Sequence, residues 1–208
     1  EVVRIAGLAT GPNHPEQWGA TPEAVDFFDI KADVEAMLTL ACSDDEISFR
    51  ATEHPALQPG QSAEVIRGEV VIGIIGKLHP KIAKTYDLKR AMYLFEFDAE
   101  KMLTTATPIA ASISKFPAIR RDISVIVNDE VSVDELLAAV AASSPTLIQG
   151  VKIFDIYKGA GIEAGRKSIA IGLILQETSR TLTDDDADEV MAAALKNLHD
   201  QFKGELRD

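Results

Sequence analysis

The strongest constraint on the fold is the order of strand-like and helix-like segments in the second half of the chain. The predicted segments are, in order, a strand at 121–127, a helix at 133–143, strands at 151–158 and 167–176, a helix at 184–202 and a short strand at 204–207. This β-α-β-β-α-β order is typical of a split ferredoxin-like domain. We therefore expect a four-stranded antiparallel sheet with both helices on one of its faces.

Both predicted helices carry recognisable boundary signals. Ser132 and Glu135 have the spacing of a capping box, and Pro145 ends the helix that follows them. Thr183 is placed to cap the second helix, and the acidic residues from Asp184 onward suit the positive end of a helix dipole. These signals support the segment order independently of hydrophobic periodicity.

The first half of the chain predicts an α+β module. Apolar residues recur at steps of three and four between Asp26 and Ala41, which indicates one buried face of a helix. The other predicted elements are strands at 2–9, 47–51, 64–67, 70–76 and 93–98 and a short helix at 80–87. The strand at 70–76 is almost wholly apolar, and its glycines predict close packing in a buried position.

Composition limits the class of protein. The chain has 208 residues, 46% hydrophobic and 26% charged, with a formal net charge of -12. These values are typical of a soluble globular protein, and the acidic balance argues against non-specific binding to nucleic acid. Cys42 is the only cysteine, which excludes an internal disulfide and a cysteine-based metal site. We expect a cytoplasmic protein with no membrane and no DNA partner.

The polar, proline-terminated segment 104–108 is typical of a linker. We therefore predict two domains, at 1–107 and 114–208, joined by a linker at 108–113. The first residues already read as a strand without a leading cap. This start predicts that the chain is a piece of a longer polypeptide.

A basic segment leads into the first strand of the second domain. Residues 115–122 carry Lys115, Arg120 and Arg121 in a chain that is acidic overall. Such a local concentration of cations favours an anion site. A solvated basic corner explains the same residues.

Side-chain alternation predicts which residues lie on the face that the helices leave open. These are Asp122, Ser124 and Ile126 in the first strand, Val151, Ile153, Asp155 and Tyr157 in the second, and Ser168, Ala170, Gly172 and Ile174 in the third. Phe154 and Ile156 are expected to face the helices instead. The small residues give this face a flat centre.

Cations surround the predicted face, and it carries one aromatic side chain. The candidate RNA-binding residues are Lys115, Arg120, Arg121, Tyr157, Lys158, Arg166, Lys167 and Arg180. A flat surface with an aromatic residue and a basic rim suits the unstacked bases of a single-stranded RNA loop. The same small residues suit packing against another domain. A ferredoxin-like regulatory or subunit-docking module, binding a small ligand or a protein, is therefore the alternative.

Four segments of the second half resemble a known family. They are Ile113–Ile123, Phe154–Gly159, Gly165–Ala170 and Arg180–Asp184. In order and spacing they resemble the ferredoxin-fold anticodon-binding domain of the β-subunit family of bacterial phenylalanyl-tRNA synthetase. In the first half, the segments Asp26–Glu35, His54–Ala63 and Gly73–Pro80 resemble part of the non-catalytic class II synthetase-like module of the same family.

The resemblance implies a role in an aminoacyl-tRNA synthetase. It implies an (αβ)2 enzyme that joins phenylalanine to tRNA(Phe) with ATP and magnesium. This chain would be a non-catalytic carboxy-terminal fragment that contacts the anticodon region and braces the catalytic α subunit. We expect the fragment to be inactive alone and to hold no cofactor itself.

The residues do not predict a catalytic or metal site. The four histidines are scattered, and His54 and His79 each precede a proline, which indicates turns rather than ligands. The acidic run at 184–186 is explained by the helix dipole. The glycines at 159–165 join two strands, with no following helix to hold a phosphate.

Overall fold

The computed structural model describes residues 1–40, 47–103 and 113–207. The chain divides into two compact units, Glu1–Ile109 and Ala110–Asp208. Most of the predicted linker lies outside the described residues, as do Cys42 and the predicted helix end at Ala41. The predicted domain boundaries stay predictions. None of the described helices is long and apolar enough to span a membrane.

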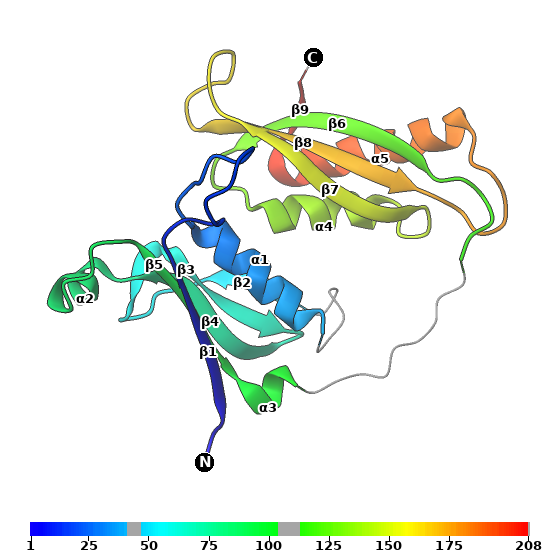
Figure 1. The fold of residues 1–208 in the computed structure, drawn as a ribbon. Helices are drawn as coiled ribbons and strands as arrows, with labels where there is room; N and C mark the ends of the chain where they lie inside the picture. Colours follow the sequence, from blue (N-terminus) through cyan, green and yellow to red (C-terminus); the bar gives the residue numbers. More distant parts are fainter. Residues whose placement is uncertain (41–46, 104–112, 208) are drawn as a thin grey trace. The chain divides into compact units, whose positions relative to one another are not determined.

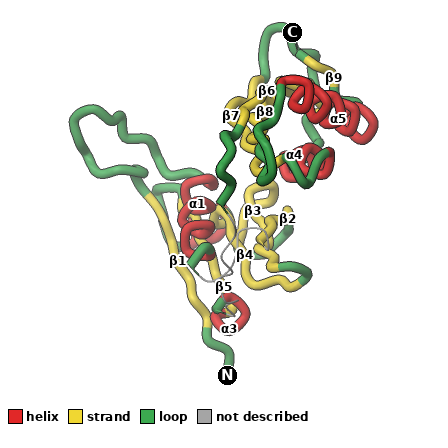
Figure 2. Tube along the Cα trace, turned by 90° about the vertical axis from the view of Figure 1, so that its right-hand side faces the viewer, coloured by secondary structure: helices red, strands yellow, loops and turns green. Residues whose placement is uncertain are grey.

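The first unit is a five-stranded antiparallel sheet with one long helix packed on it (Figure 1). Its elements are β1 (Arg4–Thr10), α1 (Phe27–Leu38), β2 (Ile47–Ala51), β3 (Leu57–Arg67), β4 (Val70–Leu78), α2 (Pro80–Thr85), β5 (Met92–Asp98) and α3 (Ala99–Met102). The strand order is β1-β5-β4-β3-β2. Figure 2 shows the long loop between β1 and α1 extending away from the sheet.

The core of the first unit lies between α1 and the sheet. Ile30 and Val34 of α1 are buried together with Ile75 and Phe97 of the sheet. A β-carbon added at Gly73 would lie 2.3 Å from the Phe97 ring. The predicted close packing at the glycines of β4 is therefore confirmed, because only glycine leaves room for this ring.

Two features of the first unit differ from the sequence prediction. Strand β3 begins at Leu57, seven residues before the predicted 64–67 segment. Its register with β4 is irregular between Leu57 and Ser62, so the apolar alternation that marks a strand is interrupted there. The short helix α3 was not predicted, and Asp98 caps it by accepting a hydrogen bond from the Lys101 amide.

The second unit has the predicted β-α-β-β-α-β order. Its elements are β6 (Ile119–Asn128), α4 (Val133–Ser143), β7 (Ile148–Tyr157), β8 (Arg166–Leu175), α5 (Asp184–Phe202) and β9 (Glu205–Leu206). The strands form an antiparallel sheet in the order β7-β8-β6-β9. Figure 1 shows both helices on the same side of this sheet. The α+β class and the ferredoxin-like pattern are confirmed.

One face of this sheet forms the core with the two helices. Ile169, Ile171 and Leu173 of β8 are fully buried against Leu136 of α4 and Leu198 of α5. Both predicted helix starts are confirmed as capping boxes, one at Ser132 with Glu135 and one at Thr183 with Asp186. The caps satisfy backbone amides that have no partner within the helix.

Strand β7 contains a β-bulge that changes its faces. Ile153 pairs with Ile171 and Asp155 pairs with Ala170, so Phe154 is the additional residue. Because a bulge interrupts the alternation of side chains, the prediction that Val151 and Ile153 lie on the open face is wrong. Both pack against the core. Phe154, predicted to face the helices, is 54% exposed.

Candidate nucleic-acid interface

We call the sheet surface opposite α4 and α5 the open face. Directly opposed residues of neighbouring strands share a face, so the strand register fixes its members. They are Arg120, Asp122, Ser124 and Ile126 of β6, Ser168, Ala170, Gly172 and Ile174 of β8, and Gly150, Lys152, Asp155 and Tyr157 of β7. The predicted members from β6 and β8 are all present, and from β7 Asp155 and Tyr157 are.

Tyr157 is the centre of one polar cluster on the open face. The Arg207 guanidinium carbon lies 4.8 Å from the centroid of the Tyr157 ring, which is a cation–π contact. Arg207 also donates from Nη1 to Ser168 Oγ at 3.3 Å, and its backbone amide donates to Ser124 O at 2.8 Å. The small Ser124 and Ser168 leave space for this arginine to reach across two strands.

A second arginine lies over a second aromatic ring on the same face. The Arg120 guanidinium carbon is 5.3 Å from the centroid of the Phe154 ring. Arg120 Nε donates to Asp122 Oδ1 at 2.8 Å, which fixes the direction of the guanidinium. A β-carbon added at Gly172 would lie 3.0 Å from Asp122 Oδ1 and 3.2 Å from Arg120 Nη2. Glycine at this position therefore makes room for the arginine–aspartate pair.

Lys152 adds a further cation to the open face. It pairs in register with Gly172 and its side chain is exposed. Among the residues that the structure describes, Lys152 has no hydrogen-bond or ion-pair partner. Its ammonium group is therefore free to contact an anion. Asp155, also exposed on this face, supplies a hydrogen-bond acceptor near Tyr157.

Two of the predicted site cations lie on the helix-covered side. Arg121 pairs in register with Leu173 and forms a salt bridge with Asp184 at the start of α5. Lys167 pairs with Val127, and its ammonium donates to the carbonyl oxygens of Asp129 and Val131. The predicted position of Arg121 at the rim of the open face is therefore corrected. Arg121 lies two residues before the buried Ile123, so alternation along β6 places it on the helix-covered face.

The environment of Lys167 also disfavours its charge. Burial lowers the pKa of the Lys167 ammonium, and the neighbouring Lys158 lowers the pKa further. The Asp129 carboxylate opposes these two effects. The hydrogen bonds that the Lys167 ammonium donates to Asp129 O and Val131 O hold the β6–α4 loop.

Two more predicted cations have ion-pair partners near the β7–β8 hairpin. Arg166 is largely buried and contacts Glu205 through Nη1 at 3.1 Å, while Nη2 donates to Ile126 O at 3.1 Å. These bonds join β6, β8 and β9. Lys158, in contrast, is 57% exposed and pairs with Asp129 at 2.8 Å. Lys158 is therefore an exposed cation that pairs with Asp129 and lies near Lys167.

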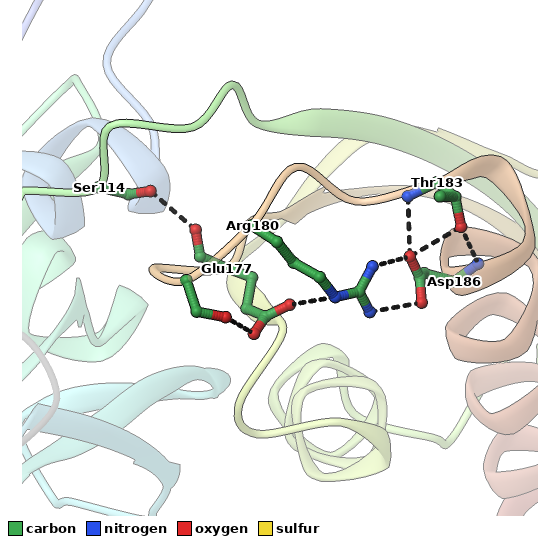
Figure 3. A network of polar contacts seen from close by, with 6 residues as sticks. Ser114, Glu177, Arg180, Thr183 and Asp186 are labelled. Atoms are coloured by element: carbon green, nitrogen blue, oxygen red, sulfur yellow. Dashed lines mark hydrogen bonds and ion pairs between the residues drawn. The ribbon is translucent and has the colours of Figure 1, made fainter.

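Lys115 lies in a lead-in segment that is tied to the second unit. Ser114 Oγ donates to Glu177 O at 2.7 Å (Figure 3). Gln176 Nε2 donates to Phe116 O at 2.6 Å. Lys115 itself is exposed and, within the described part of the chain, has no ion-pair partner. The lead-in thus has a fixed path with a free cation on it.

Arg180 belongs to a polar network at the start of α5 (Figure 3). Its two Nη atoms donate to the two Asp186 carboxylate oxygens at 2.6 and 2.7 Å, and Nε lies 3.1 Å from Glu177 Oε2. Asp186 also accepts from the Thr183 amide at 2.8 Å. Arg180 is half exposed, so only its outer edge remains for another ligand.

The network shifts the protonation of both charged partners. Hydrogen bonds from Arg180, and then from Thr183, hold the pKa of the Asp186 carboxyl far below its ordinary value. The same hydrogen bond and the charge of Asp186 raise the pKa of the Arg180 guanidinium. Both groups therefore stay charged at physiological pH, and the network orders the start of α5.

Three open-face residues were missed in the sequence. Arg207 belongs to the last predicted strand, 204–207, but was not assigned to the open face. Phe154 was predicted to face the helices and Lys152 was not considered, because the bulge in β7 cannot be read from alternation. Tyr157, Arg120, Lys115 and Lys158 remain accessible, whereas Arg121, Arg166 and Lys167 mainly bind the protein itself. Alternation along the edge strand could have indicated Arg207. Residues two positions apart share a face, so Arg207 lies on the same face as Glu205, and Leu206 lies on the other.

The first unit carries a hollow of about 510 Å³ beside the start of α1. Its lining includes Asp26, Phe28, Gln61 and Tyr93. Asp26 accepts from the Phe28 amide and forms a capping box with Asp29, so these carboxylates hold a helix end. Within residues 1–40, 47–103 and 113–207, no group of three or more histidine, cysteine or acidic side chains is arranged to hold a metal ion.

The second unit is a ferredoxin-fold domain whose open face joins aromatic rings, arginines and small residues. Residues 114–207 match the family described as "Ferredoxin-fold anticodon binding domain". Residues 1–99 match the family described as "Phenylalanyl tRNA synthetase beta chain CLM domain". The two matches cover the two units of the fold.

Curated relatives agree with both matches. The chain is 43% identical over 204 residues to the phenylalanine–tRNA ligase beta subunit of Methylococcus capsulatus, covering 98% of this chain and 26% of that protein. It is 41% identical over 201 residues to that of Shewanella oneidensis, covering 97% of this chain and 25% of that protein. The chain belongs to the phenylalanyl-tRNA synthetase β-subunit family, and it spans about a quarter of the length of these relatives.

Proposed function

We propose that this chain is a non-catalytic part of a phenylalanine–tRNA ligase and that its second unit contacts the anticodon region of tRNA(Phe). The observation that carries the proposal is the cluster on the open face around Tyr157. It combines an aromatic ring, a guanidinium group and two serine hydroxyls within direct contact distances. Membership in a family with an anticodon-binding domain supports the same conclusion.

The open face has the chemistry that single-stranded RNA needs. Aromatic side chains on a sheet stack on unpaired bases, and this stacking contributes about 1–3 kcal/mol per base. Ser124 and Ser168 provide hydroxyl groups 3.1 Å apart beside Tyr157. Ser168 is buried and already binds Ser124 and Arg207, so it orients these groups. The partly exposed Ser124 hydroxyl can both donate and accept, so it can bind a base edge or a ribose 2′-hydroxyl.

The charges on this face suit an RNA backbone despite the acidity of the chain. The accessible cations are Arg120, Lys152, Lys158 and Arg207, with Lys115 on the lead-in segment. Arg120 and Arg207 lie over the aromatic rings, whereas the acidic run at the start of α5 lies on the helix-covered side, where Asp184 pairs with Arg121. Phosphate contacts by these cations would make RNA binding fall steeply with salt concentration.

We assign a different role to the first unit, which is bracing the catalytic α subunit. Large apolar side chains are exposed there, including Trp18 at 98%, Tyr86 at 72%, Phe28 at 71% and Leu8 at 56%. Exposed apolar side chains in such number favour contact with another protein. The hollow beside α1 is lined in part by aromatic rings, and its Asp26 carboxylate caps the helix.

The whole enzyme, in this proposal, is a cytoplasmic (αβ)2 assembly that uses ATP and magnesium to join phenylalanine to tRNA(Phe). The chain alone lacks aminoacylation activity. Mixing the chain with phenylalanine and ATP is expected to give no pyrophosphate exchange. Exchange activity from this chain by itself would contradict a non-catalytic role.

A titration with tRNA(Phe) at two salt concentrations tests the RNA contact. We expect the 208-residue chain to bind and its affinity to fall steeply as salt rises. Tyr157→Leu should weaken binding about tenfold through lost stacking. The matched control is Tyr86→Leu, which removes an exposed tyrosine of the first unit.

The outcomes separate the proposal from a ferredoxin-like regulatory module. Salt-insensitive binding, or equal behaviour of Tyr157→Leu and Tyr86→Leu, would contradict RNA binding on the open face. The α-subunit role has its own test, in which a purified α subunit immobilised on resin captures this chain. We expect tRNA(Phe) to increase the captured fraction, and an absence of capture would contradict the bracing role.

A further inference from the structure

Phe154 is the one large aromatic side chain of the described second unit that is exposed by more than half. Its relative exposure is 54%, although a phenylalanine in a sheet ordinarily packs into a core. The bulge in β7 places it on the same side as Asp155 and Tyr157, because an inserted residue interrupts the alternation. The ring therefore lies on the open face without a packing role in the core of the second unit.

The groups around Phe154 are those of a stacking site for a planar anion-bearing ligand. Arg120 already lies over the ring, and Asp122 holds Arg120 through Nε, so the outer edge of the guanidinium is directed by the protein. Gly172 forms the floor beneath the arginine–aspartate pair. Lys152, next to Gly172 in register, adds an unpaired ammonium among the described residues.

The arrangement repeats that of Tyr157 on the same strand. Each ring has an arginine over it, Arg207 for Tyr157 and Arg120 for Phe154. Phe154 lies three residues before Tyr157, which corresponds to about 10 Å along a strand. Four-stranded sheets that bind RNA can stack two or three bases on aromatic side chains of the sheet.

We propose that Phe154, Arg120 and Lys152 form a second nucleotide site, which binds a base of the same RNA loop that reaches Tyr157. This inference rests on the proposed function. The base stacks on the Phe154 ring, and Arg120 and Lys152 contact the phosphates that flank it. The open face then holds at least two unstacked nucleotides, in a track that runs along β7.

The test uses the 208-residue chain and an RNA hairpin with the anticodon stem and loop of tRNA(Phe). 2-Aminopurine replaces one loop base at a time, and its fluorescence reports stacking on the protein. We expect two loop positions to respond. Phe154→Leu should abolish one response and weaken binding by about 5- to 100-fold, and Tyr157→Leu should abolish the other.

The lysine is tested by a charge-matched pair of variants. Lys152→Ala should reduce the slope of log affinity against log salt by about 1, because one phosphate contact is lost. Lys196→Ala removes an exposed lysine of α5, on the helix-covered side, and should leave the slope unchanged. Thermal unfolding of each variant checks that the fold is kept, since both lysines and Phe154 are exposed.

The results distinguish the two proposals. If Phe154→Leu binds as the unchanged chain does and both loop positions still respond, the second site is wrong and the proposed function stands. If the chain binds no hairpin in any form, the proposed function fails and the second site fails with it. An equal loss of slope in Lys152→Ala and Lys196→Ala would contradict the assigned phosphate contact.

Discussion

The two faces of the second sheet carry similar residues and use them differently. On the open face, Arg120 lies over an aromatic ring and keeps its outer edge accessible. On the opposite face, its neighbour Arg121 pairs with Asp184 and fixes the start of α5 against the sheet. Two adjacent arginines in one basic segment therefore have separate tasks.

The comparison shows that a cation's task depends on the face that it occupies. Arg121 and Lys167, on the helix side, bind the chain itself, so their charges stabilise the fold. Arg120 and Lys152, on the open face, leave donors for a ligand. A count of basic residues near a strand would not make this distinction.

The largest expected difference between the faces is in stability. Leu173→Ala empties a fully buried position and should lower the free energy of unfolding by about 2–5 kcal/mol. Ile174→Ala, one residue along on the open face, should cost about 1 kcal/mol or less because its side chain is partly exposed. Urea titrations followed by circular dichroism measure both losses, and equal losses would contradict the difference in burial between the two faces.

The second-largest expected difference is between the effects of replacing Arg120 and Arg121. Arg120→Ala should weaken tRNA(Phe) binding by about tenfold and reduce the salt slope by about 1, because a ligand contact is lost. Arg121→Ala should leave affinity and slope unchanged and lower stability by about 0.5 kcal/mol, the usual contribution of a partly exposed ion pair. Fluorescence titration and thermal unfolding give the two readouts. A larger loss of affinity in Arg121→Ala would reverse the assignment.

A smaller effect concerns the helix cap on the helix-covered side. Thr183→Ala removes the side chain that accepts from the Asp186 amide and should cost about 1 kcal/mol of stability. RNA affinity should stay constant because the cap does not belong to the open face. Ser132→Ala is the matched change at the start of α4. Loss of RNA affinity in the Thr183 variant alone would show that the two faces are coupled.

The smallest expected effect is a pH dependence of the Arg180 network. The pKa of Asp186 is lowered in the folded chain, so its contribution to stability is complete above the ordinary pKa of 3.8. That contribution is lost as the pH falls through the folded pKa. Asp186→Asn should therefore reduce the thermal midpoint at pH 7, and the gap to the unchanged chain should narrow only below about pH 4. A constant gap from pH 7 to pH 2 would contradict this origin.

The elements of the second unit and their order can be predicted from local sequence signals. Periodicity, capping boxes and the acidic start of α5 are local signals, so they identify helices and strands without knowledge of the partners. The same local alternation identified most of the open face, including Tyr157, Ser124 and Ser168. It was not applied to Arg121, which was predicted at the rim of the open face because of its charge although it lies two residues before the buried Ile123.

The pairing of β7 with β8 and the partners of the cations depend on contacts between segments that are distant in the sequence. The bulge at Phe154 depends on the register between two strands, and alternation along one strand contains no information about it. Arg207 reaches Tyr157 across two strands, which no sequence spacing predicts. Burial and pairing arise between segments far apart in the chain, so the face and the task of each charged residue were settled only when the sheet was assembled.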